Sequence, residues 1–136
     1  MPDTAALIAR YYDTFNGGDR AAFLALLSDD VVHDISQGAR EIGKPAFARF
    51  LERMDRCYRE RIVVEAICVD ATGARASAEY IVHGTYLATD TGLPPARGQT
   101  YVLPGGAFFT VQGGRVARIA NHYNLEEWLR QISKGS

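Results

Sequence analysis

Apolar positions along this chain follow a helical repeat up to about residue 60 and an alternating repeat after it. Before that point, apolar side chains recur every three or four residues, as they do from Phe47 to Tyr58, which is typical of helices that bury one face. After it, apolar and polar residues alternate, which is typical of strands with one buried face. Helices first and strands later predict an α+β fold.

The helical part is expected to contain three helices, with one short strand between the second and the third. The first helix is predicted over residues 4–16, with Asp3 as its N-cap and Gly17-Gly18 as its end. A second, shorter helix is predicted after it, and the third has Pro45 in its first turn. The other expected segments are a helix at 20–27, a strand at 31–35 and a loop at 38–43.

The alternating part predicts an antiparallel sheet that ends in a hairpin and a short closing helix. The expected strands cover residues 61–71, 74–88, 100–103, 107–112 and 116–123. A bend or bulge is expected at Pro104-Gly105-Gly106, and residues 88–99 form a loop that can act as a lid or rim. Gly113-Gly114 joins the hairpin, and Asn124 caps the closing helix. Such a sheet, curled over helices, encloses a cone that is open at one end.

Polar side chains occur where these patterns place the interior of the cone. On the last strand, Ile119 shares a face with Asn121 and Tyr123, so that face turns polar near its end, as expected of a strand that enters a pocket. Tyr11 falls inside the apolar stripe of the first helix. Its hydroxyl can bond a backbone carbonyl or point into a cavity, and spacing alone does not decide between the two.

The strand at residues 31–35 leaves a second choice open. Alternation puts either His33 or Asp34 on the face that looks into the cone, and the other residue then faces solvent. Tyr58, at the end of the third helix, is placed to reach the rim of a pocket.

Composition narrows the classes of function. A chain of 136 residues is expected to form a single domain, 1–136, and a net charge of −1 without a basic cluster argues against nucleic acid. No apolar run approaches the length of about 20 residues of a membrane helix, so we expect no membrane partner and a cytoplasmic protein. Cys57 and Cys68 are predicted to be reduced, and the three histidines lack metal-binding spacing. We therefore expect no metal and no cofactor.

Several segments resemble the NTF2-like superfamily, and within it the SnoaL-like and ketosteroid isomerase-related branch. The resemblance covers essentially the whole chain. Its motifs are ARYYDTFNGGDRAAFLALLSDDVVHDI, EIGKPAF and FTVQGGRVARI, with HDISQG, ARGQTYVLPGGAFF and HYNLEEWL pointing to the isomerase-related group. It implies a cone in which three N-terminal helices pack on a curved antiparallel sheet, with a short C-terminal helix and a homodimer formed through the outer sheet face.

The resemblance also implies roles for single residues. Ketosteroid isomerases use a carboxylate base and two oxyanion donors, and by resemblance the base falls on Asp34 and the first donor on Tyr11. The second donor position holds Ala107, which cannot donate a hydrogen bond. The candidate substrate-binding residues, some of which can replace that donor, are Asn121, Tyr123, Phe109, Tyr101, His33 and Tyr58.

These residues favour a cofactor-free enzyme that moves a proton, as an isomerase or cyclase does, on a small, largely apolar carbonyl compound resembling a steroid or a polyketide. Two alternatives remain at this point: a module that binds an apolar ligand without converting it, and a protein-interaction domain. The position of the Asp34 carboxylate separates them, because a carboxylate in solvent, away from the cavity, favours the binding module.

Overall fold

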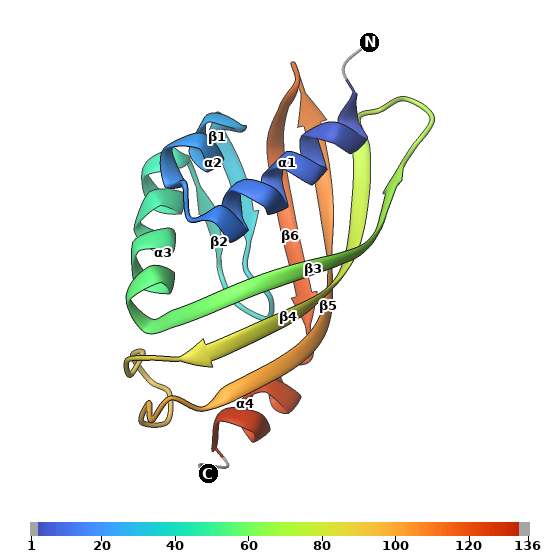
Figure 1. The fold of residues 1–136 in the computed structure, drawn as a ribbon. Coiled ribbons are helices and arrows are strands. Elements are labelled where there is room, and N and C mark those ends of the chain that lie inside the picture. Colours follow the sequence, from blue (N-terminus) through green and yellow to red (C-terminus); the bar gives the residue numbers. More distant parts are fainter. Residues whose placement is uncertain (1–2, 134–136) are drawn as a thin grey trace.

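Six strands form one strongly bent sheet, and helices cover its inner side, in the computed structural model of the chain, which describes residues 3–133 (Figure 1). In chain order the elements are α1 (Thr4–Gly17), α2 (Arg20–Ala25), β1 (Leu27–Asp34), β2 (Arg40–Ile42), α3 (Lys44–Cys57), β3 (Tyr58–Val69), β4 (Arg75–Tyr86), β5 (Thr100–Gln112), β6 (Arg115–Tyr123) and α4 (Leu125–Ser133). The α+β class predicted from the two repeats is confirmed.

Local sequence signals determine where the first helices begin and end. The side chain of Asp3 accepts a hydrogen bond from the backbone N–H of Ala6 (3.1 Å), and Gly18 ends α1 in the left-handed region, with a φ of 74°. The predicted cap and the predicted glycine stop are both confirmed. α2 is shorter than predicted, because Leu27 already pairs with Val116 as the first residue of β1.

The sheet has the strand order β2-β1-β6-β5-β4-β3 and is mixed rather than fully antiparallel. β1 runs parallel to β6, and the other neighbouring strands are antiparallel. The prediction of an antiparallel sheet is therefore wrong at this one pair. Alternation marks a strand but not the direction of its neighbour, which here depends on the long connection from β1 through α3 and the strands that follow it.

Two segments predicted to be irregular are strands in the structure. Residues 40–42, inside the predicted loop, form β2 and pair with the end of β1. β5 continues through Pro104, Gly105 and Gly106, and its register with β4 has no shift there, so the predicted bend or bulge is wrong. β5 lies between β4 and β6, and pairing on both sides keeps this stretch extended in spite of its proline and glycines.

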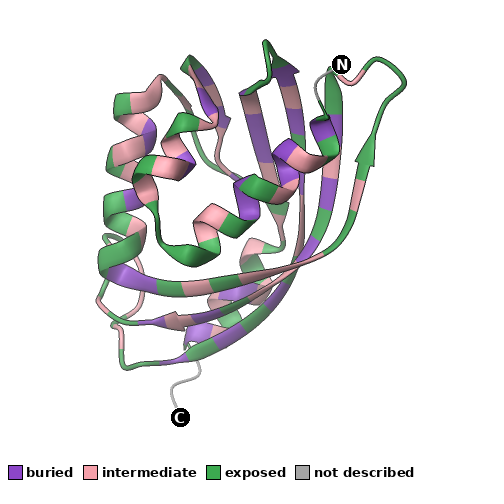
Figure 2. Cartoon of the chain, turned by 45° about the horizontal axis from the view of Figure 1, so that its top comes forward, coloured by how far each residue is buried: buried purple, intermediate pink, exposed green. Residues whose placement is uncertain are grey.

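The helices α1, α2 and α3 lie on the concave side of the sheet and turn their buried residues towards it (Figure 2). Two strands, β1 and β2, separate α2 from α3, where the sequence predicted one, so the expected group of three N-terminal helices is matched only in part. α4 packs beside β5 at the bottom of Figure 1, at the end of the molecule away from α1 and α2. Buried residues form two clusters, one that includes Ile8 and Phe109 and one that includes Tyr86 and Trp128.

The outer face of the sheet carries exposed apolar residues. Val102 is 52% exposed and Phe108 is 55% exposed. Covering such a face would stabilise the predicted homodimer, which stays a prediction. Within residues 3–133, each helix falls short of the length and hydropathy that crossing a membrane requires.

Candidate functional site

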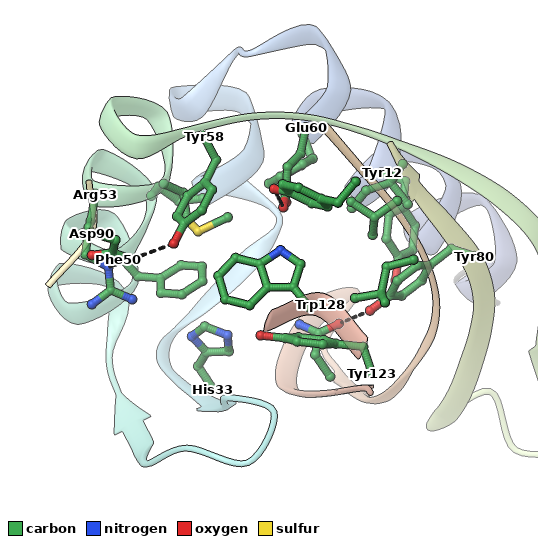
Figure 3. A pocket seen from close by; sticks show the side chains of 18 of the residues that line it. Tyr12, His33, Phe50, Arg53, Tyr58, Glu60, Tyr80, Asp90, Tyr123 and Trp128 are labelled. Atoms are coloured by element: carbon green, nitrogen blue, oxygen red, sulfur yellow. Dashed lines mark hydrogen bonds and ion pairs between the residues drawn. The ribbon is translucent and has the colours of Figure 1, made fainter. Parts of the chain in front are cut away.

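A cavity of about 290 Å³ lies inside the cone and is lined by residues of both buried clusters (Figure 3). Its wall is mainly aromatic and aliphatic and takes side chains from the four helices and from each strand except β2. Sites for small molecules usually have volumes of about 300–1,000 Å³ and mostly apolar walls with a few polar groups. This cavity therefore has the lining of such a site, and its volume lies at the lower limit of the range, which fits a compact apolar ligand.

Most of the residues that the sequence singles out lie in this wall. They are Tyr11, His33, Tyr58, Tyr101, Asn121 and Tyr123. Asn121 and Tyr123 come from the end of β6, where the buried face was predicted to turn polar and enter a pocket. Contact of these residues with a substrate stays a prediction. Two of the predicted site residues, Asp34 and Phe109, lie outside the wall.

Asp34 faces away from the cavity, so the predicted position of the base is corrected. Its carboxylate accepts hydrogen bonds from Arg40 (2.6 and 3.0 Å) and from Arg118 (3.0 Å) on the outer side of the sheet. The hydrogen bond from Arg40, with a further one from Arg118, holds the pKa of Asp34 below its ordinary value. The physical reason is alternation: Val31 and His33 share the buried face of β1, which leaves Asp34 on the outer face, where two guanidinium groups pair with it.

His33 occupies the inward position that alternation left open. It is 2% exposed, and its ring stacks on Phe47 at 4.4 Å and meets the edge of Phe50 at 4.7 Å. Burial lowers the pKa of His33 to about 4, although the nearby charge of Asp34 acts in the opposite direction. The imidazole is therefore neutral at pH 7 and presents one donor and one acceptor nitrogen.

Phe109 belongs to the packed core rather than to the cavity wall, which corrects its predicted position in that wall. Its side chain is 1% exposed, and its ring lies 5.2 Å from that of Tyr11 and 6.2 Å from that of Tyr12. Both tyrosines are on α1 and line the cavity, and Phe109 packs against them without lining it. Burial raises the pKa of Tyr11 well above its ordinary value, so its phenol stays protonated.

Glu60, which the sequence analysis did not single out, places a carboxylate in the cavity wall. The hydroxyl of Tyr101 donates a hydrogen bond to it. Burial raises the pKa of Glu60, and the hydrogen bond from Tyr101 offsets part of that rise. Tyr80 and Tyr123 have raised pKa values, mainly through burial and secondly through the negative charge of Glu60. Glu60 thus interacts with three tyrosines of the cavity.

Glu60 was missed because the strand was predicted to start at residue 61, whereas β3 starts at Tyr58. A usable signal was present. Glu60 alternates in step with Ile62 and Val64, so it belongs to the apolar face of the strand. A glutamate on the buried face of a strand needs a partner or a function, and this one has Tyr101.

Glycines opposite two tyrosines create the room in which the tyrosines lie over the sheet. Glu60, Gly84 and Tyr101 form one row across β3, β4 and β5. A Cβ atom on Gly84 would come within 2.1 Å of the Tyr101 ring, and a Cβ atom on Gly105 would come within 2.6 Å of the Tyr80 ring. Only glycine lets Tyr101 cross over β4 to reach Glu60.

The hydroxyl groups of Tyr80 and Tyr12 lie in the same part of the wall. The Tyr80 hydroxyl donates to Oδ1 of Asn121 at 3.0 Å, which leaves the amide N–H groups of Asn121 available to a ligand. The rings of Tyr12 and Tyr80 are 5.9 Å apart. The Tyr12 hydroxyl is buried and has no hydrogen-bond partner among the residues that the structure describes. Neither tyrosine was singled out from the sequence.

The loop between β4 and β5 borders the cavity, as its predicted role as a rim requires. It contributes Asp90 and Leu93 to the wall. The Tyr58 hydroxyl donates to Asp90 at 2.8 Å, and Arg53 lies 3.7 Å from the same carboxylate. Burial, with the hydrogen bond to Asp90, raises the pKa of Tyr58. These contacts hold the loop against the end of α3.

The state of His33 predicts a pH dependence of stability. Because its folded-state pKa is about 4 and its unfolded value about 6.5, the unfolded chain binds more protons between these values. Stability is therefore complete above about pH 6.5 and falls as the pH falls. We expect the free energy of unfolding to drop by on the order of 2 kcal/mol from about pH 7.5 to about pH 5, measured by urea denaturation.

The His33→Phe variant is the control for this prediction, because phenylalanine keeps the stack on Phe47 but cannot titrate. Glu60 has a raised pKa and acts with the opposite sign, so its contribution is lost as the pH rises. Subtracting the His33→Phe curve from the wild-type curve isolates His33. Identical pH profiles for the two proteins would contradict the buried neutral imidazole.

Comparison with known proteins places the chain in a family. Residues 8–119 match the family model of the SnoaL-like domain. The chain therefore belongs to the SnoaL-like family, as the sequence motifs implied. No curated protein matches the sequence of this chain. Within residues 3–133, no group of three or more His, Cys, Asp or Glu residues is placed to hold a metal ion.

Solved structures of similar proteins share this architecture. A candidate polyketide cyclase from Pseudomonas putida KT2440 is 57% identical with a TM-score of 0.91, over 93% of this chain and 95% of that one. A candidate ketosteroid isomerase from Kribbella flavida is 25% identical with a TM-score of 0.68, over 89% and 77%. An NTF2-like protein from Burkholderia pseudomallei, 17% identical with a TM-score of 0.83 over 98% and 99%, shares the fold.

Proposed function

We propose that this protein binds a small, largely apolar carbonyl compound inside the cone and catalyses proton transfer at the carbon next to the carbonyl. Isomerisation and aldol-type cyclisation both begin with that step. Support comes from three sides: an apolar cavity of suitable volume, membership of the SnoaL-like family, and a carboxylate in the cavity wall. The polyketide cyclase and ketosteroid isomerase names of similar proteins fit the same class of substrate.

The observation that carries the proposal is the position of Glu60. A carboxylate whose pKa is raised by burial is a stronger base than a solvated one, and proton transfer is most efficient when that pKa lies near the working pH. Glu60 takes over the role that the resemblance assigned to Asp34. The carboxylate of Glu60 takes the proton, so that an O–H bond forms on Glu60 as the C–H bond of the substrate breaks. The electron pair of that C–H bond moves towards the carbonyl oxygen and gives an enolate.

Donors are available for the oxygen of that enolate. The Tyr12 hydroxyl and the amide N–H groups of Asn121, which have no partner among residues 3–133, belong to the wall that also contains Glu60. Hydrogen bonds to a developing oxyanion in a water-poor site are worth about 2.7–4 kcal/mol each. The Tyr12 hydroxyl and the Asn121 amide replace the donor that Ala107 cannot supply. Protonated Glu60 then returns its proton to another carbon, or to the alkoxide formed when the enolate attacks a second carbonyl.

The proposal is tested by deuterium exchange with the wild-type protein. Cyclic ketones of one to three rings, β-tetralone among them, are incubated with the protein in D₂O, and incorporation next to the carbonyl is followed by NMR. We expect exchange faster than in buffer alone for the ketones that bind. Ketones that bind without accelerated exchange would overturn the catalytic part of the proposal.

A second function, binding without conversion, is favoured by the position of Asp34, because a carboxylate away from the cavity is the outcome that the sequence analysis assigned to a binding module. Asp34 is paired with arginines outside the cavity and Ala107 occupies the second donor position, so neither carries the isomerase role that the resemblance implies. The exchange experiment separates the two functions, because a binding module protects its ligand and does not exchange its protons.

A further inference from the structure

Two polar groups in the cavity wall are buried without a hydrogen-bond partner. They are the Nδ1 atom of His33 and the hydroxyl of Tyr12, and no residue that the structure describes pairs with either. The two residues are 2% and 3% exposed. Buried polar groups in proteins are nearly always paired, so an exception requires an explanation. A ligand that brings the missing partners is one.

His33 cannot easily turn to find a partner within the protein. Its ring is held on one side by the stacked ring of Phe47, with an angle of 21° between the planes, and on another by the edge of Phe50. Asp34, the charged residue next to His33 in the chain, points to the outer face and is occupied by two arginines. Glu41, opposite His33 on β2, has a buried Oε1 atom that forms no hydrogen bond with His33 or with any other residue that the structure describes. The imidazole is thus fixed, neutral and available as a hydrogen-bonding group in an otherwise apolar part of the wall.

Tyr12 and His33 come from opposite sides of the cavity. Figure 3 shows Tyr12 beside Tyr80 on one side, and His33 beside Phe50 of α3 on the other. Apolar residues such as Leu103 and Leu125 complete the wall. A ligand that satisfies both groups has an apolar body with an oxygen function at each end.

We propose that the substrate carries two oxygen functions separated by an apolar ring system: the carbonyl that undergoes proton transfer, bound by Tyr12, and a hydroxyl group bound by His33. This inference rests on the proposed function, and it adds the class of substrate: a hydroxylated cyclic ketone. His33 then determines specificity and takes no part in the transfer of the proton.

The inference is tested by measuring binding of matched ligands by calorimetry. The ligands are β-tetralone and its phenolic derivatives, each hydroxylated at one position of the aromatic ring. We expect the wild-type protein to bind at least one phenolic derivative about tenfold more tightly than β-tetralone, because a hydrogen bond to a buried partner is gained. In the His33→Phe variant this preference should disappear.

Two further variants separate a specific contact from a general change. Tyr12→Phe should weaken both ligands by a similar factor, so the ratio of the two affinities stays as in the wild type. His122→Phe makes the same substitution as His33→Phe at an exposed position on the outer face, and it should preserve the preference. Far-UV circular dichroism and thermal unfolding establish that each variant is folded.

The outcomes distinguish this inference from the proposed function. Equal affinities of the wild-type protein for all ligands, or a preference that survives in His33→Phe, would overturn the inference and leave proton transfer untouched. If no ketone binds at all, both fall. A preference lost only in His33→Phe supports the inference even if no ligand is converted.

Discussion

Replacing Glu60 by glutamine is expected to lower the rate of ketone proton exchange by about a hundredfold to ten-thousandfold, which is the usual contribution of a positioned general base. Glutamine has nearly the same shape and can still accept the hydrogen bond from Tyr101, but it cannot take a proton. Ligand affinity and the unfolding midpoint should therefore change little. Rates are measured by deuterium incorporation into β-tetralone in D₂O, with affinities measured in parallel.

Asp34→Asn is the matched control for this prediction. It also removes one carboxylate, but one that lies outside the cavity and is paired with Arg40 and Arg118. Its exchange rate should equal that of the wild-type protein. The opposite pattern, with loss of exchange in Asp34→Asn and an active Glu60→Gln, would return the role of base to Asp34 and refute the one proposed for Glu60.

The pH dependence of exchange gives an independent check on Glu60. A base acts in its deprotonated form, so the rate should rise with pH and level off above the pKa of Glu60, which burial places above the ordinary value of a glutamate. A rate that has already levelled off by about pH 5 would mean that the titrating base has the pKa of a solvated carboxylate, about 4, and it would count against Glu60.

Phe109→Ala is expected to lower the free energy of unfolding by about 3–5 kcal/mol, the usual cost of removing a buried phenylalanine ring. Phe109 is 1% exposed and packs against Tyr11 and Tyr12, so its removal leaves a cavity within the core beneath α1. Urea denaturation measures the change. Phe109→Leu should cost less, since most of the volume stays filled.

The neighbouring residue supplies the control. Phe108 lies on the same strand but on the outer face, where it is 55% exposed, so Phe108→Ala should change stability far less than Phe109→Ala. If Phe109→Ala instead weakens ligand binding while the stability stays unchanged, Phe109 lines the cavity, as predicted from the sequence, and its assignment to the core is wrong.

Several parts of this site could be predicted from the sequence because they depend on local periodicity. The buried face of β6 turns polar at Asn121 and Tyr123, and both residues lie in the cavity wall. Tyr11, in the apolar stripe of α1, lies there too. The spacing of apolar residues within one helix or strand places such residues on its inner side, and this spacing does not depend on the other elements of the chain.

Other parts could not be predicted, since they depend on which elements become neighbours. His33 shares the buried face of β1 with Val31, and Asp34 on the opposite face meets two arginines, one of them on β6, a strand distant in sequence. The carboxylate of Glu60 reaches the cavity because β3 begins at Tyr58, and its partner Tyr101 crosses over Gly84 on the strand between them.

What the sequence by itself determined here is the class of fold, the positions of most helices and strands, and the apolar, tyrosine-rich character of the interior. These follow from spacing and capping, which act over a few residues. Only the tertiary structure decided which carboxylate stands inside the cone and which is neutralised outside it. Charge pairing and burial depend on residues far apart in the chain, and the energy of a carboxylate depends on the neighbours that folding brings to it.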